Sequence, residues 1–290
     1  MKVGLIQLDG KRPNLALLKL ATWHKNKGDD VTILDLSGYK FDVTYASKIF
    51  VGGSGYNIKA KLPDGIEEVV PDYNAFNLDY SIVHTTRGCF RSCDFCIVKE
   101  KEGELTEIDN WKEKITKSKV ILLDNNFLAS KYAREKLQYF IDNKIKVCFD
   151  QGLDIRLVNE EYAQLLSKVK YYDSKFNYRV LYFAFDDVNI EPIIRKKIPI
   201  LINGGIKSHH LMFYMLIGFN SSINDDLKRV NILWDEFGCL PFVMIYNNKK
   251  GKLLHLFSKW VNKRVHKKYT WDEWLDYTNY KEERHYEYLQ

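Results

Sequence analysis

Three of the five cysteines form a Cys-x₃-Cys-x₂-Cys cluster at Cys89, Cys93 and Cys96. Thiolates at this spacing are typical of a metal or iron–sulfur centre, and a reducing cytosol would disfavour disulfides between them. Three thiolates on one loop can hold three corners of an iron–sulfur cubane, which a fourth Cys normally completes. The other two cysteines, Cys148 and Cys239, lie in no adjacent motif. The spacing therefore predicts a cluster in which one iron keeps an exchangeable ligand.

Zinc is the alternative occupant of this cluster. Together with His84, the three cysteines would make a Cys₃His zinc site. Zinc sites more often combine two Cys-x-x-Cys-like pairs, and a second pair is missing from this sequence. The residue pattern therefore favours the iron–sulfur cluster over zinc.

The elements around the cysteines are expected to alternate between strands and helices. Strands are predicted at 81–85, 120–123, 146–149, 180–185, 211–217 and 242–246, and helices at 129–143, 160–169 and 225–237. Six strands that are each followed by helical sequence indicate an α/β fold, a partial (β/α)₆ TIM-type barrel. The cysteines follow the first of these strands. Because chemistry in such barrels occurs where strands end, we expect the cysteines at the functional rim.

The rest of the chain is expected to form three smaller parts. Residues 1–56 show a β-α-β-β pattern that predicts a small Rossmann-like layer, and residues 57–80 hold polar turns typical of a connector. The barrel is expected over 81–248, and residues 249–290 form a basic, aromatic-rich helical extension. These boundaries predict one large domain with a small layer before it and an extension after it.

The cysteine cluster and its surroundings resemble the radical S-adenosylmethionine (SAM) superfamily. The resemblance rests on the Cys-x₃-Cys-x₂-Cys spacing, on the aromatic Phe95 before the last cysteine, and on the position after a first barrel strand. The preceding residues 85–89 (TTRGC) are similar to the branch of cobalamin-binding-domain enzymes and methylthiotransferases. The resemblance to the superfamily covers the region from Ser81 to about Asn247, and it extends more loosely to the N-terminal layer.

The resemblance implies a [4Fe–4S] cluster on the three cysteines, with SAM chelating the fourth iron. It implies an enzyme of oxidoreductase or transferase type that cleaves SAM reductively to a 5′-deoxyadenosyl radical, which abstracts hydrogen from a substrate. A low-potential electron donor of the flavodoxin or ferredoxin type is the implied partner. Such chemistry needs a tuned cluster and an interior that excludes water.

The same resemblance places cofactor-binding residues at successive strand ends. The candidates are Asp124 and Asn125 after the second strand, Asp154 and Arg156 after the third, Asp186 after the fourth, Gly218 after the fifth, and Phe95 in the cysteine loop. Asp124 matches the position that grips the SAM amino group in the family, and Gly218 matches the adenine-contacting segment. Taken singly, each of these residues is also explained by an ordinary turn, helix cap or ion pair.

Cobalamin binding is not expected, although the related branch binds it. The loop after the first strand reads DGKRPN over 9–14 and has no histidine to ligate cobalt. We therefore interpret the N-terminal layer as vestigial or substrate-facing. A corrinoid-dependent radical SAM methyltransferase remains an alternative function.

Composition and charge limit the partners. The net charge is +6, and no apolar run approaches the roughly 20 residues that span a bilayer, so a cytoplasmic protein without membrane contact is expected. Eight lysines and arginines occur over 249–268 without an acidic residue. This segment predicts an amphipathic helix docked on the barrel, or an RNA contact with Trp271 and Trp274 as stacking residues. A non-catalytic, metal-binding RNA module is the second alternative.

Overall fold

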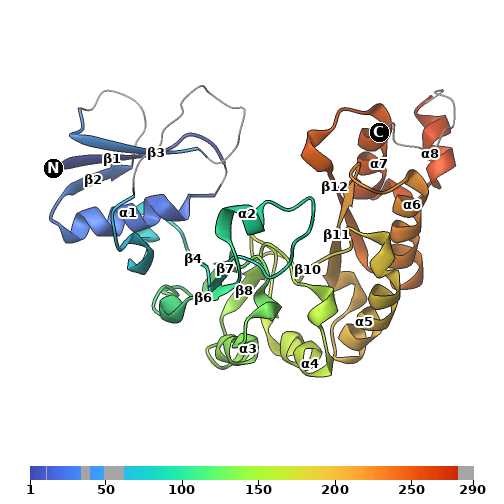
Figure 1. The fold of residues 1–290 in the computed structure, drawn as a ribbon, viewed down its shortest axis with the longest axis horizontal. Helices are drawn as coiled ribbons and strands as arrows, with labels where there is room; N and C mark the ends of the chain where they lie inside the picture. The colour runs from blue at the N-terminus through green and yellow to red at the C-terminus, as the bar shows by residue number, and fades with distance from the viewer. Residues whose placement is uncertain (11, 34–39, 49–61, 280–290) are drawn as a thin grey trace. The chain divides into compact units, whose positions relative to one another are not determined.

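A computed structural model of the chain describes residues 1–10, 12–33, 40–48 and 62–279 (Figure 1). The chain divides into two compact units, of which the first comprises residues 1–83 and 109–120 and the second residues 84–108 and 121–290. The predicted boundary at residue 56 falls outside the described residues. The boundaries at 80 and 248 stay predictions.

The N-terminal part of the first unit is a parallel three-stranded sheet with one helix. Strands β1 (Lys2–Gln7), β2 (Asp30–Ile33) and β3 (Val43–Ser47) lie in the order β2-β1-β3, and β1 pairs in parallel with both neighbours. Helix α1 (Leu15–Asn26) begins where the Asn14 side chain accepts a hydrogen bond from the Ala16 amide. Its apolar face joins Val3 and Leu5 in a small core. The predicted β-α-β-β opening is confirmed.

The second unit contains a parallel sheet of strands β10 (Leu181–Ala184), β11 (Leu211–Ile217) and β12 (Leu240–Ile245). Burial alternates strictly along β11, so one face of this sheet is fully buried and the other is half exposed. Helices follow the first two strands, α5 (Glu191–Asn203) after β10 and α6 (Ile223–Asn231) after β11. This arrangement is the strand–helix alternation expected of an α/β protein.

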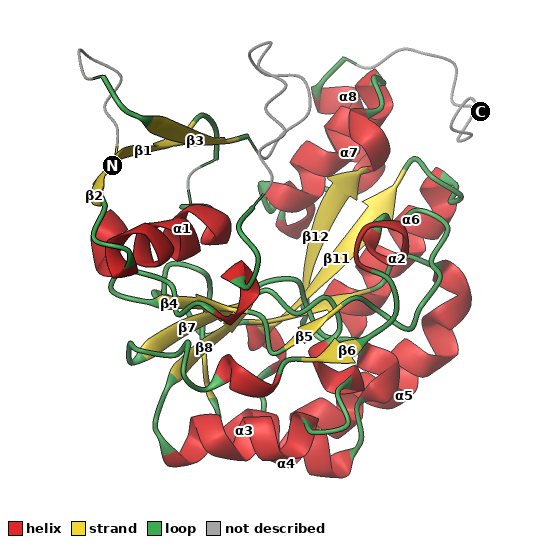
Figure 2. Ribbon diagram, turned by 60° about the vertical axis from the view of Figure 1, so that its left-hand side comes forward, coloured by secondary structure: helices red, strands yellow, loops and turns green. Residues whose placement is uncertain are grey.

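A second sheet has the order β4-β7-β8-β9. Its strands are β4 (Ser81–Val83), β7 (Lys119–Leu122), β8 (Lys146–Phe149) and β9 (Lys170–Tyr171), and β8 pairs in parallel with β9. Helices α3 (Ala133–Asp142) and α4 (Glu160–Lys168) follow β7 and β8, and Figure 2 shows them with α5 on the same side of the strands. A parallel bridge joins Leu153, after β8, to Phe183 of β10. The described strands form several small parallel sheets, and no closed barrel is detected among them.

All six strands predicted for the barrel region are present: β8 and β11 have the predicted bounds, and the ends of the other four shift by at most two residues. The predicted helix over 129–143 begins later, at Ala133, because a short 3₁₀ turn (Phe127–Ala129) and the bend and turn over 130–132 come before it. The helix predicted over 225–237 is α6 followed by a π-helical turn, Ile232–Glu236.

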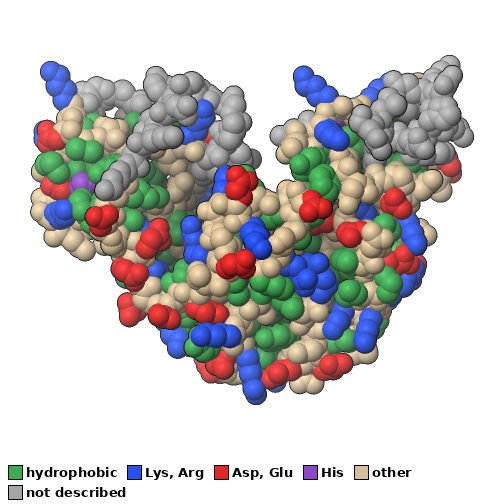
Figure 3. Space-filling model, in the orientation of Figure 1, with side chains coloured by type: hydrophobic (Ala, Val, Ile, Leu, Met, Phe, Trp, Pro, Cys, Tyr) green, Lys and Arg blue, Asp and Glu red, His purple; other side chains and the backbone are tan. Residues whose placement is uncertain are grey.

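The C-terminal segment folds as α7 (Lys252–Asn262), a 3₁₀ turn (Val265–Lys267) and α8 (Trp271–Tyr277). Leu254, Phe257, Trp260 and Val261 are buried on one face of α7, and its lysines are exposed, so the predicted amphipathic helix is confirmed. None of the described helices is long and apolar enough to traverse a bilayer. Figure 3 shows basic and acidic side chains interspersed on the face that it presents.

Candidate functional site

The three cysteines lie in the loop of a small antiparallel hairpin that sequence analysis did not anticipate. Strand β5 (Thr86–Arg87) pairs with β6 (Thr106–Glu107), and the loop between them carries all three cysteines and helix α2 (Val98–Glu102). The three thiols are free; Cys89 and Cys93 are half-buried and Cys96 is exposed. The Cys96 amide donates to the Cys93 carbonyl at 2.9 Å, so these two cysteines share one turn. The hairpin thus holds three thiols on one short segment.

Gly88 sets the entry of the chain into this loop. Its φ of +73° is in the left-handed region, and a Cβ built on it would lie 2.2 Å from the carbonyl oxygen of Glu104 and 2.6 Å from that of Gly103. The amide of the next residue, Cys89, donates to the same Gly103 carbonyl at 3.2 Å. The backbone can cross the loop this closely only because residue 88 has no side chain.

Replacing Gly88 by alanine is therefore expected to destabilise the protein in two ways, through the left-handed backbone conformation and through the clash of the new Cβ with the loop. The matched control is Gly205→Ala in the same unit, where φ is +100° and the new Cβ would meet only ordinary contacts at 3.5 Å. We expect about 1–2 kcal/mol of destabilisation for Gly205→Ala from the backbone conformation, and a clearly larger loss for Gly88→Ala from the added clash. Urea unfolding of both variants measures this, and equal losses would contradict the close approach.

Asp124, two residues after β7, is buried and fully engaged by the start of the hairpin. Its Oδ1 accepts hydrogen bonds from the hydroxyls of Thr85 (2.6 Å) and Thr86 (2.7 Å) and from the Thr86 amide (2.6 Å), and the Thr85 amide lies 3.1 Å from both oxygens. Burial raises the pKa of Asp124, against the effect of these hydrogen bonds. The structure thus places Asp124 as the residue that fixes the strand end leading to the cysteines.

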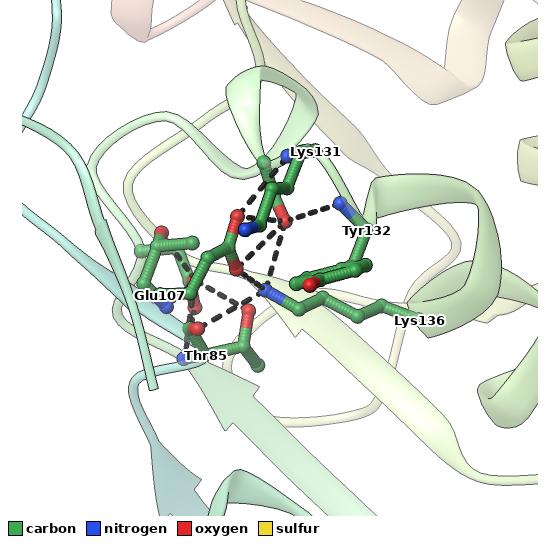
Figure 4. Close-up of polar contacts among 8 residues, drawn as sticks. Thr85, Glu107, Lys131, Tyr132 and Lys136 are labelled. Atoms are coloured by element: carbon green, nitrogen blue, oxygen red, sulfur yellow. Dashed lines mark hydrogen bonds and ion pairs between the residues drawn. The ribbon is translucent and has the colours of Figure 1, made fainter. Parts of the chain in front are cut away.

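A buried ion pair closes the base of the same hairpin (Figure 4). The Lys136 ammonium of α3 lies 2.6 Å from Oε2 of Glu107 and donates to the Thr85 carbonyl (3.0 Å) and the Ser130 hydroxyl (2.9 Å). The Ser130 hydroxyl and the Lys131 amide also donate to the Glu107 carboxylate. The side chains of Lys136 and Glu107 are only 2% and 16% exposed. Because every donor here is used, the network holds both strands of the hairpin on α3.

Asp154 forms ion pairs with two arginines next to the cysteines, Arg91 and Arg156. It lies after β8 and accepts from Nε of Arg156 at 2.7 Å and from Nε of Arg91, a residue of the cysteine loop, at 2.8 Å. Burial opposes ionisation, but the hydrogen bonds and charges of Arg156 and Arg91 outweigh it and lower the pKa of Asp154. Burial also raises the pKa of the Cys93 thiol, and the neighbouring Arg156 charge opposes that shift. The predicted residues Asp154 and Arg156 are thus brought to the cysteine loop.

Asn126 is a buried polar residue beside the cysteines that was not among the predicted site residues. Its Nδ2 lies 3.8 Å from the Cys89 sulfur and 3.5 Å from Asp154 Oδ2. Its Oδ1 is buried and has no hydrogen-bond partner among the described residues. The predicted residue Asn125 has a different partner: its Nδ2 donates to Glu102 of α2 at 3.0 Å. A buried acceptor without a donor needs an explanation, and a ligand donor supplies one.

Asp186 lies at the end of β10, in electrostatic reach of both Cys93 and Arg156. Its Oδ1 accepts from the Leu216 amide at 2.8 Å, and burial raises its pKa. The fully buried Arg229 of α6 donates to the Phe185 and Asp186 carbonyls and pairs with Asp226. Asp186 is therefore held in place by the neighbouring strand while it faces the cysteine region.

Phe95 connects the cysteine loop to the end of β11. Its ring lies edge-on to Phe219 at 5.8 Å between centroids, and Phe219 in turn contacts Tyr246 at 4.8 Å. Gly218 has a φ of +74°, and a Cβ there would lie 3.1 Å from Leu254 of α7. Close packing on α7 and the left-handed turn thus account for this glycine, and its predicted contact with an adenine ring stays a prediction.

The donor atoms of the cysteine loop suit the two metal centres suggested by the sequence to different degrees. Three free thiols on one loop, with a sulfur that accepts from the Arg91 amide at 3.4 Å, are the donors that an iron–sulfur cluster requires. Nε2 of His84, the fourth zinc ligand in the alternative, lies 3.0 Å from the Arg87 guanidinium. Across the described part of the chain, no three His, Cys, Asp or Glu side chains are arranged to hold one metal ion. In an iron–sulfur cubane each cysteine thiolate binds a different iron, so the three sulfurs need not converge on one metal ion.

Comparison with known proteins adds no family assignment. No protein-family model matches the chain, and no curated protein matches its sequence. The geometry shows an α/β protein with parallel sheets in which three thiols, two arginines, a buried asparagine and two carboxylates meet.

Proposed function

We propose that this chain is a radical SAM enzyme whose [4Fe–4S] cluster is bound by Cys89, Cys93 and Cys96. The observation that carries the proposal is a hairpin loop with three free thiols whose base is anchored by buried polar residues. A loop that holds a cofactor at a fixed position requires such an anchor, because side chains that are not held in place bind a metal centre weakly. When bound, the reduced cluster would supply one electron to the sulfonium of SAM, which starts hydrogen abstraction from a substrate.

The chain's own charges suit an anionic thiolate centre. Arg91 and Arg156 are both held on Asp154, and Arg156 lies next to Cys93. Of these two positive charges, that of Arg156 opposes the rise in the Cys93 pKa that burial and the nearby Asp186 cause. Positive neighbours favour the thiolate form of cysteine, which is the form that binds iron.

Asn126 is the residue best suited to the SAM amino group. Its buried Oδ1 is an acceptor without a partner among the described residues, and its amide group lies against Cys89. An ammonium group would satisfy that oxygen. Asp124, the residue that the resemblance selects for this role, is instead occupied by Thr85 and Thr86, so we assign it to positioning of the loop.

The partial barrel belongs to the same proposal. Strands β4, β7 and β8 are neighbours in one sheet and β10, β11 and β12 in another, each set in chain order, and the Leu153–Phe183 bridge joins the two sets. The half-exposed face of the second set carries the stacked rings of Tyr182 and Tyr214, 5.3 Å apart. An apolar, aromatic face inside an open (β/α)₆ arc would give a radical intermediate the water-poor surroundings that it needs.

The remaining parts of the proposal follow from the resemblance. The N-terminal sheet would be a vestigial or substrate-facing layer without cobalamin, a flavodoxin- or ferredoxin-type protein would deliver the electron, and the enzyme would act in the cytoplasm. The substrate is left open between nucleotides, peptides and small metabolites.

Anaerobic reconstitution with iron and sulfide, followed by SAM and dithionite, tests the proposal. We expect 5′-deoxyadenosine and methionine to form in equal amounts, as liquid chromatography with mass detection would show. If the fully reconstituted protein binds SAM but yields neither product, the proposed chemistry is wrong.

A further inference from the structure

A cavity of about 690 Å³ lies between α6, the π-helical turn after it, and the segment from Trp260 to Glu273. This volume is within the roughly 300–1,000 Å³ typical of ligand sites. Figure 1 shows α6, α7 and α8 together in the orange to red part of the chain. The cavity shares no residue with the cysteine site. It needs an explanation of its own.

The walls of this cavity are aromatic. Trp234, Trp260, Tyr269 and Trp271 line it together with His266. The His266 ring lies edge-on to Trp234 at 5.3 Å and stands at a steep angle to Trp260 at 5.8 Å. Trp234 lies in the π-helical turn, a feature that is rare and frequent at functional sites. Aromatic walls of this kind suit a flat, aromatic ligand.

Two buried ring nitrogens of the cavity lining have no hydrogen-bond partner among the described residues. They are Nε1 of Trp271, a side chain that is 95% buried, and Nε2 of His266. His266 Nδ1 lies 3.3 Å from the Trp260 carbonyl, which selects the tautomer that donates from Nδ1 and leaves Nε2 as an acceptor. These two residues of the lining thus hold one donor and one acceptor that no described residue engages. The edge of a nucleobase carries an acceptor that can pair with such a donor and a donor that can pair with such an acceptor.

The rim of the cavity carries more cations than carboxylates: three lysines, of which Lys228 pairs with Glu191, line it together with Asp235 and Glu273. Lys228, Lys267 and Lys268 line it, and the Lys267 ammonium lies 4.1 Å from the centre of the Trp234 ring. The segment that leads to the cavity adds further exposed cations over 249–264: Lys249, Lys250, Lys252, Lys259, Lys263 and Arg264. No acidic residue occurs between 249 and 268. Exposed cations beside aromatic walls are the arrangement that binds single-stranded nucleic acid.

We propose that this cavity, the C-terminal aromatic pocket, binds one base of a single-stranded nucleic acid while the adjacent lysines contact its phosphates. The inference does not depend on the cysteine cluster, because none of its residues takes part in the cysteine site. The Trp271 and His266 nitrogens would read the base edge, and Trp234 would supply stacking.

The test measures binding of fluorescein-labelled 12-mers to the full chain by anisotropy at several salt concentrations. The probes are single-stranded RNA, single-stranded DNA of the same sequence, the corresponding duplex, and free AMP as a competitor. We expect both single strands to bind more tightly than the duplex, with affinity that falls as salt rises. A preference for RNA or for DNA would show which of the two nucleic acids supplies the bound base. Free AMP should compete with the labelled strands at high concentration.

Three variants locate the site. Trp234→Ala should weaken single-strand binding by on the order of tenfold or more through lost stacking. The double variant Lys267→Ala/Lys268→Ala should lower the slope of log affinity against log salt by about 1.4, and both of its side chains are exposed, so the fold is retained. Lys168→Ala/Lys170→Ala removes two exposed lysines outside the cavity and should bind like the wild type.

Several results would overturn the inference. These are the absence of single-strand binding at low salt, equal affinity for the duplex, or unchanged binding by both pocket variants. Cys93→Ala should bind the oligonucleotides normally, so failure of the proposed enzyme function and failure of this site are distinguishable.

Discussion

Cys93→Ala is expected to abolish both cluster binding and SAM cleavage. Cys93 is the middle thiol of the loop and lies beside Arg156, and without it only two cysteines remain at the candidate centre. Mutation of residues that merely orient metal ligands lowers affinity by roughly 10–100-fold, and loss of a ligand itself should exceed this range. We expect iron content after anaerobic reconstitution to fall to background and 5′-deoxyadenosine to disappear.

The matched control for this variant is Cys239→Ala. Cys239 is fully buried away from the loop, and burial raises its pKa to about 12, so it is an inert thiol. The control should keep the iron and the activity of the wild type. If Cys93→Ala retains both iron and product formation, or if Cys239→Ala loses them equally, the assignment of the cysteine loop is wrong.

Lys136→Met is expected to cause the largest loss of stability outside the apolar core. The substitution removes the ammonium from a buried pair with Glu107 and takes one of two donors from the Thr85 carbonyl, which keeps its hydrogen bond from the Ile108 amide. Removing one partner of a buried pair typically costs about 3–5 kcal/mol. Urea unfolding at pH 7 measures the loss. Since the network anchors the hairpin, the variant should also take up less iron.

The control for Lys136→Met is Arg134→Met on the same helix. Arg134 pairs with Glu161 at 2.8 Å, but both side chains are largely exposed, so the cost should stay below about 1 kcal/mol. The double variant Lys136→Met/Glu107→Leu should recover part of the stability because no charge is then left unpaired. Equal costs for the two single variants would contradict a structural role of the buried pair.

The buried pair also has a defined dependence on pH. Burial opposes ionisation of Glu107, but Lys136 and Ser130 outweigh it and lower the pKa of Glu107 below its ordinary value of 4.5. Its contribution is therefore present above pH 4.5 and lost as the pH falls through the lower, folded-state pKa. The stability difference between the wild type and Lys136→Met/Glu107→Leu should shrink over that acid range.

The strands and the cysteine loop could be predicted from the sequence because their signals are local. Apolar runs such as residues 211–217 specify a buried strand by themselves, and the structure has β11 at the same residues. The hairpin of β5 and β6 could not be predicted, because each strand has only two residues and pairs across a long loop. It is anchored by side chains that are distant in sequence: Lys136 of α3, Ser130 and Asp124.

The site residues also divide into those whose contacts follow from local sequence and those whose contacts depend on distant packing. Asp154 and Arg156 are close in sequence, and their ion pair follows from that spacing. The engagement of Asp124 by Thr85 and Thr86 and the contact of Asn126 with Cys89 depend on the packing of two strand ends. Strand order decides such contacts, and a single sequence does not specify strand order. Asn126 could have been included with its neighbours, since all three polar residues follow β7.

The metal content of the chain purified without oxygen tests the central claim most directly. Iron and acid-labile sulfide are quantified together with zinc, and the visible absorption spectrum is recorded before and after dithionite. A [4Fe–4S] centre predicts about four iron and four sulfide per chain, with brown colour that bleaches on reduction. Colourless protein that contains zinc or no metal, even after reconstitution with iron and sulfide, would contradict it.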